Sequence, residues 1–570
     1  MQKNGTIIKS FTKEVKIMTL GDLVVDVIKK LGVNHVFGVP GDYNLRFLDY
    51  IAGNDKLKWI GNCNELNASY AADGYARENG AGVLVTTLGV GELSAANGIA
   101  GSYAHNIPIL HIVGYPNSKV IEYDIPVHHT LANFKKNSFL ESFTPISGAT
   151  TILTETNYIE EIGRVVSNML ITKKPSYLGL PTDLVDLDVS ETIEDIYFYY
   201  GNGDDHMVAD IGDIIIKRYL EASSPMFLLG INIARFGWRE IMTQILQKNQ
   251  AKFVTTLMGK SIINETSVAE PNYLGIYAGD YSTDGIVKVV QNADCIISIG
   301  TVETDINCGG FTEDGIDFDN VITIRPNSVK IAKKLYSGIS IDALLEYILE
   351  NISPNKRANI DFKREDVAVD IENFVNNDNK LNQKDFWPLV AKEIVKEGDI
   401  VVAEAGTALF GLVGQNLPPK IDFVSQLLWA SIGYTLPSAV GSAIASPSRR
   451  VLLFIGDGSF QLTAQELSLI SRYNLNITVF LINNNGYTIE RAIHGAKQSY
   501  NDISKWKYLD FAKSLGVDKT ISIKSFKDFV KNIKTINQDG PKMIELFFDK
   551  LDYPPLLKQI SDKLEEANRQ

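Results

Sequence analysis

Short apolar runs recur along most of the chain, and a segment with helix-like spacing of apolar residues follows each run. Most runs are four to eight residues long and rich in Val, Ile and Leu, and several end in Gly, Pro, Asp or Asn. This pattern is typical of strands buried on both faces of a parallel sheet. The runs cover residues 35–41, 82–89, 109–114, 226–231, 295–300, 321–324, 399–406, 451–456, 477–483 and 543–548. The alternation predicts an α/β fold in which mainly parallel sheets are flanked by helices.

Two polar stretches, residues 200–206 and 351–379, interrupt this alternation. The blocks that they separate have the size of ordinary α/β domains, so we expect three domains. The expected segments are a mobile N-terminal extension at 1–17, domains at 18–195, 205–345 and 381–570, and a linker at 346–380.

Composition narrows the class of protein. The formal net charge of −13 argues against a nucleic-acid partner, which would require a basic face. Three cysteines are too few to cross-link a chain of 570 residues and indicate a reducing compartment. No run approaches the roughly 18 apolar residues of a membrane span, and the first residues lack the apolar core of a secretory signal. We therefore expect a soluble, cytoplasmic protein with neither nucleic acid nor membrane as a partner.

The most informative motif lies in the last block, where two apolar runs each end in a polar turn. The first run leads into Asp457 within a Gly-Asp-Gly turn, and the second leads into Asn484 and Gly486. In a parallel sheet both turns emerge at the carboxyl edge, where ligands of α/β folds bind. A carboxylate, an amide oxygen and a backbone carbonyl suit Mg²⁺, which keeps phosphate oxygens as further ligands. Backbone N–H groups of the glycine-rich turn and the following helix could hold that phosphate.

Other interpretations of this region are simpler. A single Gly-Asp-Gly is more often only a tight turn, and the pairing of two such turns is what favours a diphosphate–metal site. Neither a Walker A pattern nor a strand-linked G-x-G-x-x-G is present, so nucleoside triphosphates and dinucleotides have no support. The spacing of Thr463 and Glu466 also predicts a capping box near the start of the following helix.

The two turns, at this separation, resemble the cofactor motif of thiamine-diphosphate enzymes. Residues 19–557 resemble the non-oxidative 2-oxo acid decarboxylases of that group, which act on pyruvate, indolepyruvate, phenylpyruvate and branched-chain 2-oxo acids. The most specific segments are residues 37–49, 62–77, 127–132, 431–435 and 483–495. The resemblance implies decarboxylation of a 2-oxo acid to an aldehyde and CO₂, with thiamine diphosphate and Mg²⁺ as cofactors.

The resemblance also implies which residues hold the cofactor. Glu65 would hydrogen-bond to the aminopyrimidine ring and activate the cofactor, Ile432 would support its bent shape, and the Ala430 carbonyl would accept from the ring. Asp457, Asn484 and Gly486 would bind the metal. The residues expected to contact the cofactor or its metal are Glu65, Thr407, Ala430, Ile432, Asp457, Gly458, Ser459, Asn484, Gly486, Tyr487 and Ile489.

An acid–base set follows from the same resemblance. The expected catalytic residues are Asp42, Glu65, His128, His129 and Glu490. An isolated pair of histidines is more often a surface or core feature, but here matching carboxylates accompany it. Loss of CO₂ leaves a carbanion that must be protonated, and aldehyde release must remove a hydroxyl proton. Histidines and clustered carboxylates can titrate near neutrality for both steps, and the sequence leaves open which group makes which transfer.

The resemblance places apolar residues above the reacting centre. The expected pocket residues are Leu409, Phe410, Ile489, Ile493, Ile560 and Leu564. At position 409, leucine leaves more room in the pocket than Trp or Phe would and less room than Ala would. An aliphatic pocket separates substrates by only about 1–3 kcal/mol per methylene, so we expect a broad range. Branched-chain or other larger aliphatic 2-oxo acids are favoured, and pyruvate, indolepyruvate and phenylpyruvate stay open. For residues 560 and 564, an ordinary packing stripe is an equal alternative.

In the resembling family the two cofactor-binding domains of one site come from different subunits. A homodimer is therefore the expected minimum and a homotetramer the expected assembly. One alternative function is a carboligase of the acetohydroxyacid synthase type, although such enzymes lack the paired histidines. A second is a non-catalytic cofactor-binding protein, although each expected catalytic position is occupied. A Mg²⁺-dependent phosphatase is more distant, because no nucleophile motif accompanies the Gly-Asp-Gly turn.

Overall fold

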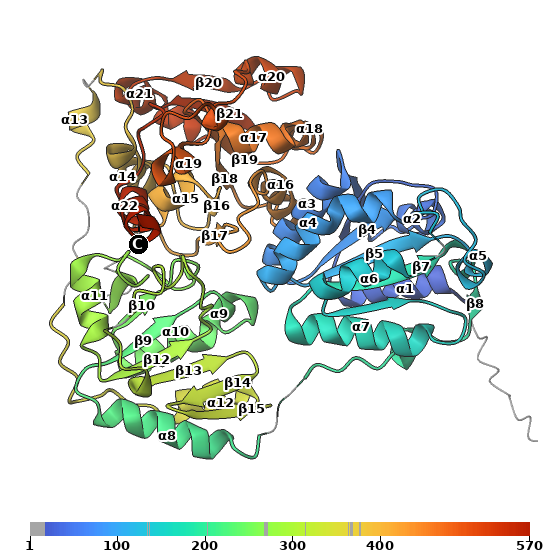
Figure 1. Ribbon diagram of the computed structural model, residues 1–570, viewed down its shortest axis with the longest axis horizontal. Coiled ribbons are helices and arrows are strands. Elements are labelled where there is room, and N and C mark those ends of the chain that lie inside the picture. Colours follow the sequence, from blue (N-terminus) through green and yellow to red (C-terminus); the bar gives the residue numbers. More distant parts are fainter. Residues whose placement is uncertain are drawn as a thin grey trace, which may run out of the picture.

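Three sheets flanked by helices make up the chain in this computed structural model (Figure 1). The structure describes residues 18–569 apart from 134, 136, 202, 204, 267–271, 314, 363, 365–368 and 376–377. The expected N-terminal extension, residues 1–17, lies outside the described residues. Among the described residues, none of the helices combines the length and apolar character that crossing a membrane demands.

The N-terminal domain holds a six-stranded parallel sheet in the order β3-β2-β4-β5-β7-β6. Its strands are β2 (His35–Gly38), β3 (Lys58–Gly61), β4 (Gly82–Thr87), β5 (Ile109–Tyr115), β6 (Ala149–Ile152) and β7 (Ser176–Pro181). Its helices are α1 (Leu20–Lys30), α2 (Leu45–Ala52), α3 (Glu65–Asn79), α4 (Val90–Ala104), α5 (Ser118–Glu122), α6 (Ser138–Phe143) and α7 (Tyr158–Thr172). A short antiparallel pair, β1 (Met18–Thr19) and β8 (Asp188–Val189), joins the two ends of this domain.

The middle domain holds a seven-stranded sheet in the order β11-β10-β9-β12-β13-β14-β15, parallel except for β14 and β15. Its strands are β9 (Pro225–Leu229), β10 (Phe253–Thr255), β11 (Tyr273–Ile276), β12 (Cys295–Ile299), β13 (Val321–Arg325), β14 (Ser328–Ile331) and β15 (Lys334–Ser337). Its helices are α8 (Val208–Glu221), α9 (Asn232–Arg235), α10 (Arg239–Asn249), α11 (Asp284–Gln291) and α12 (Ile341–Asn351). Because Ile348 of α12 packs in the core of this domain, the domain continues beyond its expected end at residue 345, into the expected linker.

The C-terminal domain holds a six-stranded parallel sheet in the order β17-β16-β18-β19-β21-β20. Its strands are β16 (Ile400–Ala403), β17 (Asp422–Val424), β18 (Val451–Gly456), β19 (Ile477–Asn483), β20 (Thr520–Ile523) and β21 (Lys542–Phe547). Helix α13 (Glu372–Val375) lies in the linker that precedes this domain. The helices of the domain are α14 (Gln383–Glu393), α15 (Thr407–Leu412), α16 (Thr435–Ala445), α17 (Asp457–Thr463), α18 (Leu467–Arg472), α19 (Thr488–Ile493), α20 (Tyr508–Ser514), α21 (Phe526–Ile536) and α22 (Pro555–Arg569). The predicted α/β fold with mainly parallel sheets is confirmed.

Helices α3 and α16 bring the N-terminal and C-terminal domains together (Figure 1). A Cβ at Gly74 would lie 2.0 Å from the Ser438 carbonyl oxygen, and one at Gly441 would lie 1.9 Å from the Ala71 carbonyl oxygen. Since real Cβ atoms do not approach an oxygen so closely, only glycine fits at either position. The small residues of α3 thus let the two helix backbones touch.

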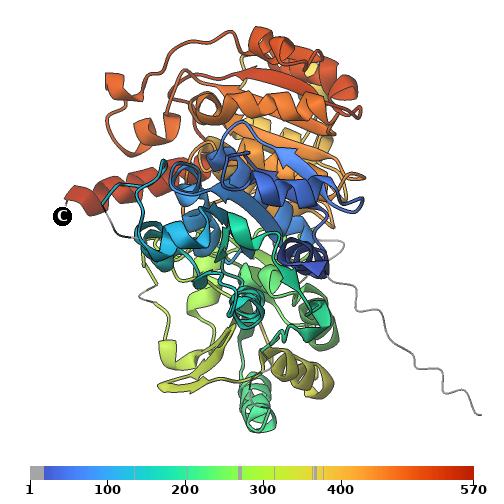
Figure 2. The same ribbon diagram turned by 90° about the vertical axis from the view of Figure 1, so that its right-hand side faces the viewer.

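The C-terminal helix α22 connects the C-terminal domain to the middle domain. In Figures 1 and 2 it lies at the level where these domains meet. The Gln559 side chain donates a hydrogen bond to the Asp280 carbonyl oxygen over 3.2 Å, and the Lys563 ammonium donates to the same oxygen over 2.7 Å. The end of the chain is thereby fixed beside α15 and α19, which carry several of the predicted site residues.

Glu92 on α4 is a buried carboxyl that forms no ion pair with any described basic side chain. It accepts a hydrogen bond from the Gly89 N–H over 2.7 Å and another from the Tyr177 hydroxyl over 2.8 Å. Burial raises the pKa of Glu92 from 4.5 to about 7 despite these two donors. The carboxyl therefore resists ionisation in the folded protein.

Replacing Glu92 with glutamine will change how the thermal midpoint depends on pH. Unfolded Glu92 ionises near pH 4.5 and folded Glu92 near pH 7, so the folded state binds more protons in between and stability falls as pH rises through this window. Glutamine does not titrate. The midpoint of Glu92→Gln minus that of the parent should therefore rise between pH 5 and pH 8 in circular-dichroism melts. A difference that stays constant would contradict this.

Candidate active site

The predicted metal ligands meet at the carboxyl edge of the C-terminal sheet. Strands β18 and β19 are parallel neighbours, with Gly456 opposite Ile482, so their polar turns lie side by side. The Asn484 side-chain amide lies 3.2 Å from Asp457 Oδ1 and 2.8 Å from the Gly486 carbonyl oxygen. A carboxylate, an amide and a backbone carbonyl from three residues thus converge on one point. This donor set fits a hard divalent cation such as Mg²⁺.

The electrostatics of Asp457 also favour a bound cation. Burial raises its pKa to about 7, although backbone N–H groups, among them those of Gly486 and Gly458, hydrogen-bond to its carboxylate and oppose this rise. Within the described part of the chain, no lysine or arginine forms an ion pair with it. A buried carboxylate without a cation is costly, and a bound divalent ion would remove that cost.

The remaining predicted diphosphate residues surround these ligands. Gly458 and Ser459 form the first turn of α17. The Tyr487 ring covers Gly458 so closely that a Cβ there would lie 2.5 Å from Cε1 of the ring. Buried Arg491, which the sequence did not single out, donates to the carbonyl oxygens of Asn485 and Asn501 over 2.8 and 2.9 Å. This guanidinium holds the loop after β19 in place.

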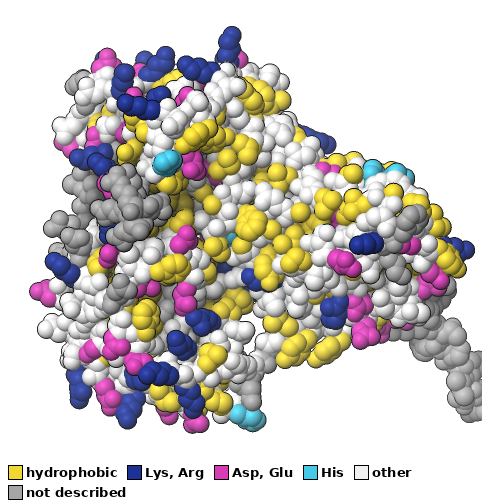
Figure 3. Space-filling view, in the orientation of Figure 1, with side chains coloured by type: hydrophobic (Ala, Val, Ile, Leu, Met, Phe, Trp, Pro, Cys, Tyr) yellow, Lys and Arg dark blue, Asp and Glu magenta, His cyan; other side chains and the backbone are white. Residues whose placement is uncertain are grey.

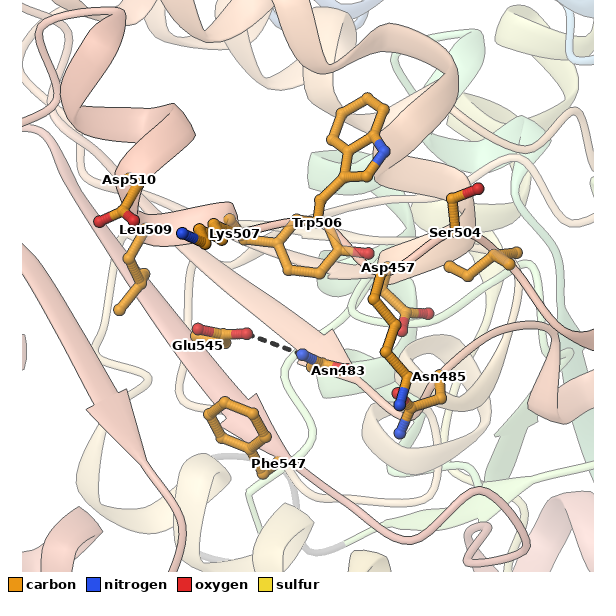
Figure 4. Close-up of a pocket in the computed structure, with 13 residues that line it drawn as sticks. Asp457, Asn483, Asn485, Ser504, Trp506, Lys507, Leu509, Asp510, Glu545 and Phe547 are labelled. Carbon is orange, nitrogen blue, oxygen red and sulfur yellow. Dashed lines mark hydrogen bonds between the residues drawn. The ribbon is translucent and has the colours of Figure 1, made fainter.

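A cavity of about 490 Å³ opens beside Asp457 at the same sheet edge (Figure 4). Trp506, Tyr508 and Phe547 supply aromatic walls, and Asn483 donates to Glu545 over 2.7 Å. Of the predicted cofactor residues, Asp457 alone is among its described lining. The cavity therefore lies next to the predicted metal ligands and does not coincide with the predicted cofactor site.

Three further predicted cofactor residues lie on neighbouring elements of the C-terminal domain. Thr407 is buried at the start of α15, directly after β16. Ala430 has a positive φ of 53°, and partly buried Ile432 follows it in the loop that leads to α16. These residues therefore belong to the loops at the carboxyl side of β16 and before α16.

Three of the predicted acid–base residues form one cluster. His128 Nε2 hydrogen-bonds to Asp42 Oδ2, and His129 Nε2 lies 3.4 Å from Asp42 Oδ1. Burial acts to raise the pKa of Asp42, but the hydrogen bond from His128 and the charges of both histidines outweigh it and lower the pKa below its ordinary value. Two imidazoles thus share one carboxylate, an arrangement that can hold and transfer a proton.

Tyr43 orients this cluster. Its ring stacks on that of His128 with centroids 4.9 Å apart, and its hydroxyl lies 3.3 Å from His128 Nδ1. His129 adopts a positive φ of 65°, and its carbonyl oxygen would lie 2.0 Å from a Cβ at Gly89. The sequence shows Tyr43 directly after Asp42, but its stacking depends on a loop 85 residues away.

Glu65 and Glu490 come from two helices outside this cluster. Glu65 is the first residue of α3, and Glu490 is exposed on α19 of the C-terminal domain. Among the hydrogen bonds and ion pairs of the described residues, none joins either carboxylate to Asp42, His128 or His129. The predicted acid–base residues therefore come from both the N-terminal and the C-terminal domain.

The start of α3 is held by Glu466, and this corrects the predicted capping box. The Glu466 carboxylate accepts from Asn62 Nδ2 over 2.6 Å and from Asn67 Nδ2 over 2.9 Å, while the Thr463 hydroxyl donates to the Gly433 carbonyl over 2.8 Å. Helix α17 instead begins at Asp457. Long-range partners outcompete the local cap, so the prediction from local spacing was wrong.

The predicted substrate-pocket residues divide into three groups. Leu409, Phe410 and Ile560 lie together in one apolar cluster, with partly buried Ile489 packed against it. Ile493 lies at the end of α19 and is partly buried outside this cluster. The side chain of Leu564 lies outside what the structure describes.

Comparisons with known proteins agree with this geometry. Three family models match: the N-terminal TPP binding domain of thiamine pyrophosphate enzymes at residues 18–138, the central domain at 213–350 and the C-terminal TPP binding domain at 412–546. The fold and site therefore define a thiamine-diphosphate enzyme.

Full-length relatives narrow the class. The chain is 34% identical to a pyruvate decarboxylase of Candida albicans, over 97% of this chain and 99% of the relative. It is 37% identical to pyruvate decarboxylase isozyme 3 of Saccharomyces cerevisiae, over 88% and 89%, and 34% identical to an alpha-keto-acid decarboxylase of Mycobacterium ulcerans, over 98% of each. The chain belongs to the family of thiamine-diphosphate-dependent 2-oxo acid decarboxylases, as its motifs predict, and is a carboxy-lyase.

Proposed function

We propose that this enzyme converts 2-oxo acids to aldehydes and CO₂ with thiamine diphosphate and Mg²⁺, and favours branched-chain or other larger aliphatic substrates over pyruvate. The convergence of His128 and His129 on the Asp42 carboxylate carries the proposal. A decarboxylase that releases an aldehyde needs two proton transfers, and this cluster offers the groups for them. Glu65 and Glu490 would complete the set.

The chain's own residues would bind, orient and move protons. When bound, thiamine diphosphate supplies the electron sink for the carbanion that loss of CO₂ leaves. Glu65 would hold a hydrogen bond to the aminopyrimidine, and Asp457, Asn484 and the Gly486 carbonyl would hold Mg²⁺ against the diphosphate. The Asp42–His128 hydrogen bond keeps a proton between Oδ2 and Nε2 at the site.

The proposed active unit is a homodimer, with a homotetramer as the expected assembly. The position of Glu490 in the C-terminal domain supports this, because the acid–base cluster lies in the N-terminal domain and a partner chain could bring the two together. Val90, Leu93, Trp429 and Leu462 are apolar yet between 42% and 57% exposed. Hydrophobic side chains also gather over the face between the N-terminal and C-terminal domains in Figure 3. Contiguous apolar surface of this kind marks protein–protein contacts.

Replacing Asp457 with asparagine will raise the Mg²⁺ concentration needed for half-maximal activity by about tenfold or more, because the ligand loses its charge. Apoenzyme stripped with chelator is titrated with Mg²⁺ at saturating thiamine diphosphate, and aldehyde is followed with alcohol dehydrogenase and NADH. Asp510→Asn removes a neighbouring carboxylate that lines the same cavity and should leave the titration unchanged. Equal Mg²⁺ requirements in all three proteins would contradict the assignment.

The substrate preference can be ranked directly. The values of kcat/KM for pyruvate, 3-methyl-2-oxobutanoate, 4-methyl-2-oxopentanoate, phenylpyruvate and indolepyruvate are compared under one set of conditions. A branched-chain substrate is expected to lead. A kcat/KM for pyruvate that exceeds the values for all the other substrates by about tenfold would overturn this preference. A tenfold difference is already of the size that one methylene contributes, about 10- to 200-fold.

Replacing Leu409 with alanine will shift specificity toward bulky substrates. The removed methyl groups free space beside Phe410 and Ile489, so kcat/KM for phenylpyruvate relative to 3-methyl-2-oxobutanoate should rise by about tenfold. Val413→Ala removes volume from the same apolar cluster outside the predicted pocket and serves as the control. An unchanged ratio for Leu409→Ala, or an equal shift in the control, would remove Leu409 from the pocket.

A further inference from the structure

We propose that Glu404 is a positioning residue, whose buried carboxyl fixes the loop that carries Ala430 and Ile432 relative to the segment that leads to Thr407. This inference rests on the proposed cofactor site. Glu404 directly follows β16 and is only 3% exposed. Glu404 is not among the site residues that the sequence predicts.

The carboxyl joins its own loop to Thr435, which lies 31 residues further along the chain. Glu404 Oε2 accepts from the Thr435 hydroxyl over 2.6 Å, and Oε1 accepts from the Ala405 N–H over 3.2 Å. The backbone N–H groups of Gly433 and Thr435 also hydrogen-bond to this carboxyl. The donors come from both the loop after β16 and the loop before α16, so each loop is held against the other.

The backbone of Gly433, the residue after Ile432, is thereby held at both its N–H group and its carbonyl group. The Gly433 N–H is bound by Glu404, and the Gly433 carbonyl accepts from the Thr463 hydroxyl over 2.8 Å. Gly433 has a positive φ of 87°, and a Cβ there would lie 2.9 Å from the Leu462 Cβ, so no other residue fits without movement. Since Ile432 directly precedes Gly433, Glu404 and Thr463 together set the position of the Ile432 side chain.

The surroundings of Glu404 favour this role over that of an ion-pair partner. Burial raises the pKa of Glu404 to about 7, and the hydrogen bonds from Thr435, Ala405 and Gly433 only partly oppose the rise. In the part of the chain that the structure describes, no lysine or arginine forms an ion pair with it. The groups bound to this carboxyl are a hydroxyl and backbone N–H groups, so it holds backbone and does not neutralise charge.

Cofactor affinity tests the proposal. Dissociation constants of thiamine diphosphate with Mg²⁺ are measured by quenching of tryptophan fluorescence for the parent, Glu404→Gln and Glu404→Ala, together with kcat at saturating cofactor. The constant is expected to rise by about tenfold or more, with a smaller loss of kcat once the cofactor is saturating. Glu92→Gln is the matched control, because Glu92 is another buried carboxyl held by one hydroxyl and one backbone N–H, and its constant should stay within about twofold of the parent value.

The outcomes separate this inference from the proposed function. Folded Glu404 variants with the parent's dissociation constant and kcat would overturn it, as would an equal rise in Glu92→Gln. If neither Glu404 variant folds, Thr463→Val replaces them, because it removes only the hydroxyl that binds Gly433; a parent-like constant there would also overturn the inference. Asp457→Asn is measured alongside, and if it too binds cofactor like the parent, the proposed site itself is wrong.

Discussion

Replacing Glu65 with glutamine will lower kcat for aldehyde formation by about two to four orders of magnitude, which is the usual contribution of a positioned acid–base group. Glutamine keeps the shape of the side chain but cannot exchange a proton with the aminopyrimidine ring. The Glu466 contacts that hold the start of α3 are untouched, so the variant should fold normally. Aldehyde formation is measured with the preferred 2-oxo acid and saturating cofactors.

A mixing experiment sharpens this prediction. If Glu65 and Asp457 act on one cofactor from different chains, a heterodimer of Glu65→Gln and Asp457→Asn contains one doubly altered site and one intact site. Activity is measured at an Mg²⁺ concentration that supports the parent but not homodimers of Asp457→Asn. Unfolding and refolding the two variants together should then restore about a quarter of the parent activity, since half of the dimers are mixed and each has one intact site. No recovery, with mixed dimers shown to form, would mean that both residues serve the same site from one chain.

Replacing Asp42 with asparagine will also lower kcat by about two to four orders of magnitude. Both histidine Nε2 atoms face this carboxylate, and asparagine removes its charge and its ability to carry the shared proton. The pH profile of kcat should change shape, because the carboxylate no longer stabilises charged imidazole. Steady-state rates between pH 5 and 8 provide the measurement.

Tyr43→Phe is the matched control for Asp42. It keeps the ring that stacks on His128 and removes the hydroxyl 3.3 Å from Nδ1, so a loss of about tenfold or less is expected for one neutral hydrogen bond. A rate for Asp42→Asn as high as that for Tyr43→Phe would mean that Asp42 only orients the histidines.

Buried parallel strands were the most predictable part of the fold. Each apolar run singled out in the sequence contains a strand, among them β4, β18 and β19. Strand β7 (Ser176–Pro181) escaped notice because serine, glycine and proline interrupt its apolar run. It is nevertheless fully buried between β5 and β6, and such burial depends on neighbours that a local pattern does not show.

The site was predictable where its residues lie in short motifs, and less so where they depend on distant partners. Asp457 and Asn484 follow strands that the hydrophobic pattern already revealed, so their meeting could be expected. Glu466 contacts residues about 400 positions away, and Glu404 binds Gly433 and Thr435 from another loop. The spacing of Glu466 suggested only a local helix cap, and nothing in the spacing of Glu404 distinguishes it from an ordinary loop charge.

The glycine contacts between α3 and α16 limit how this molecule can move. With Gly74 and Gly441 pressed against opposing carbonyl groups, neither helix can slide or rotate along the other without a collision. We therefore expect the two cofactor-binding domains of one chain to move as a single rigid body. Entry and exit of a tightly held cofactor would then require rearranged loops or loosened contacts between chains. Slow cofactor exchange would therefore follow from the close helix contact that these two glycines allow.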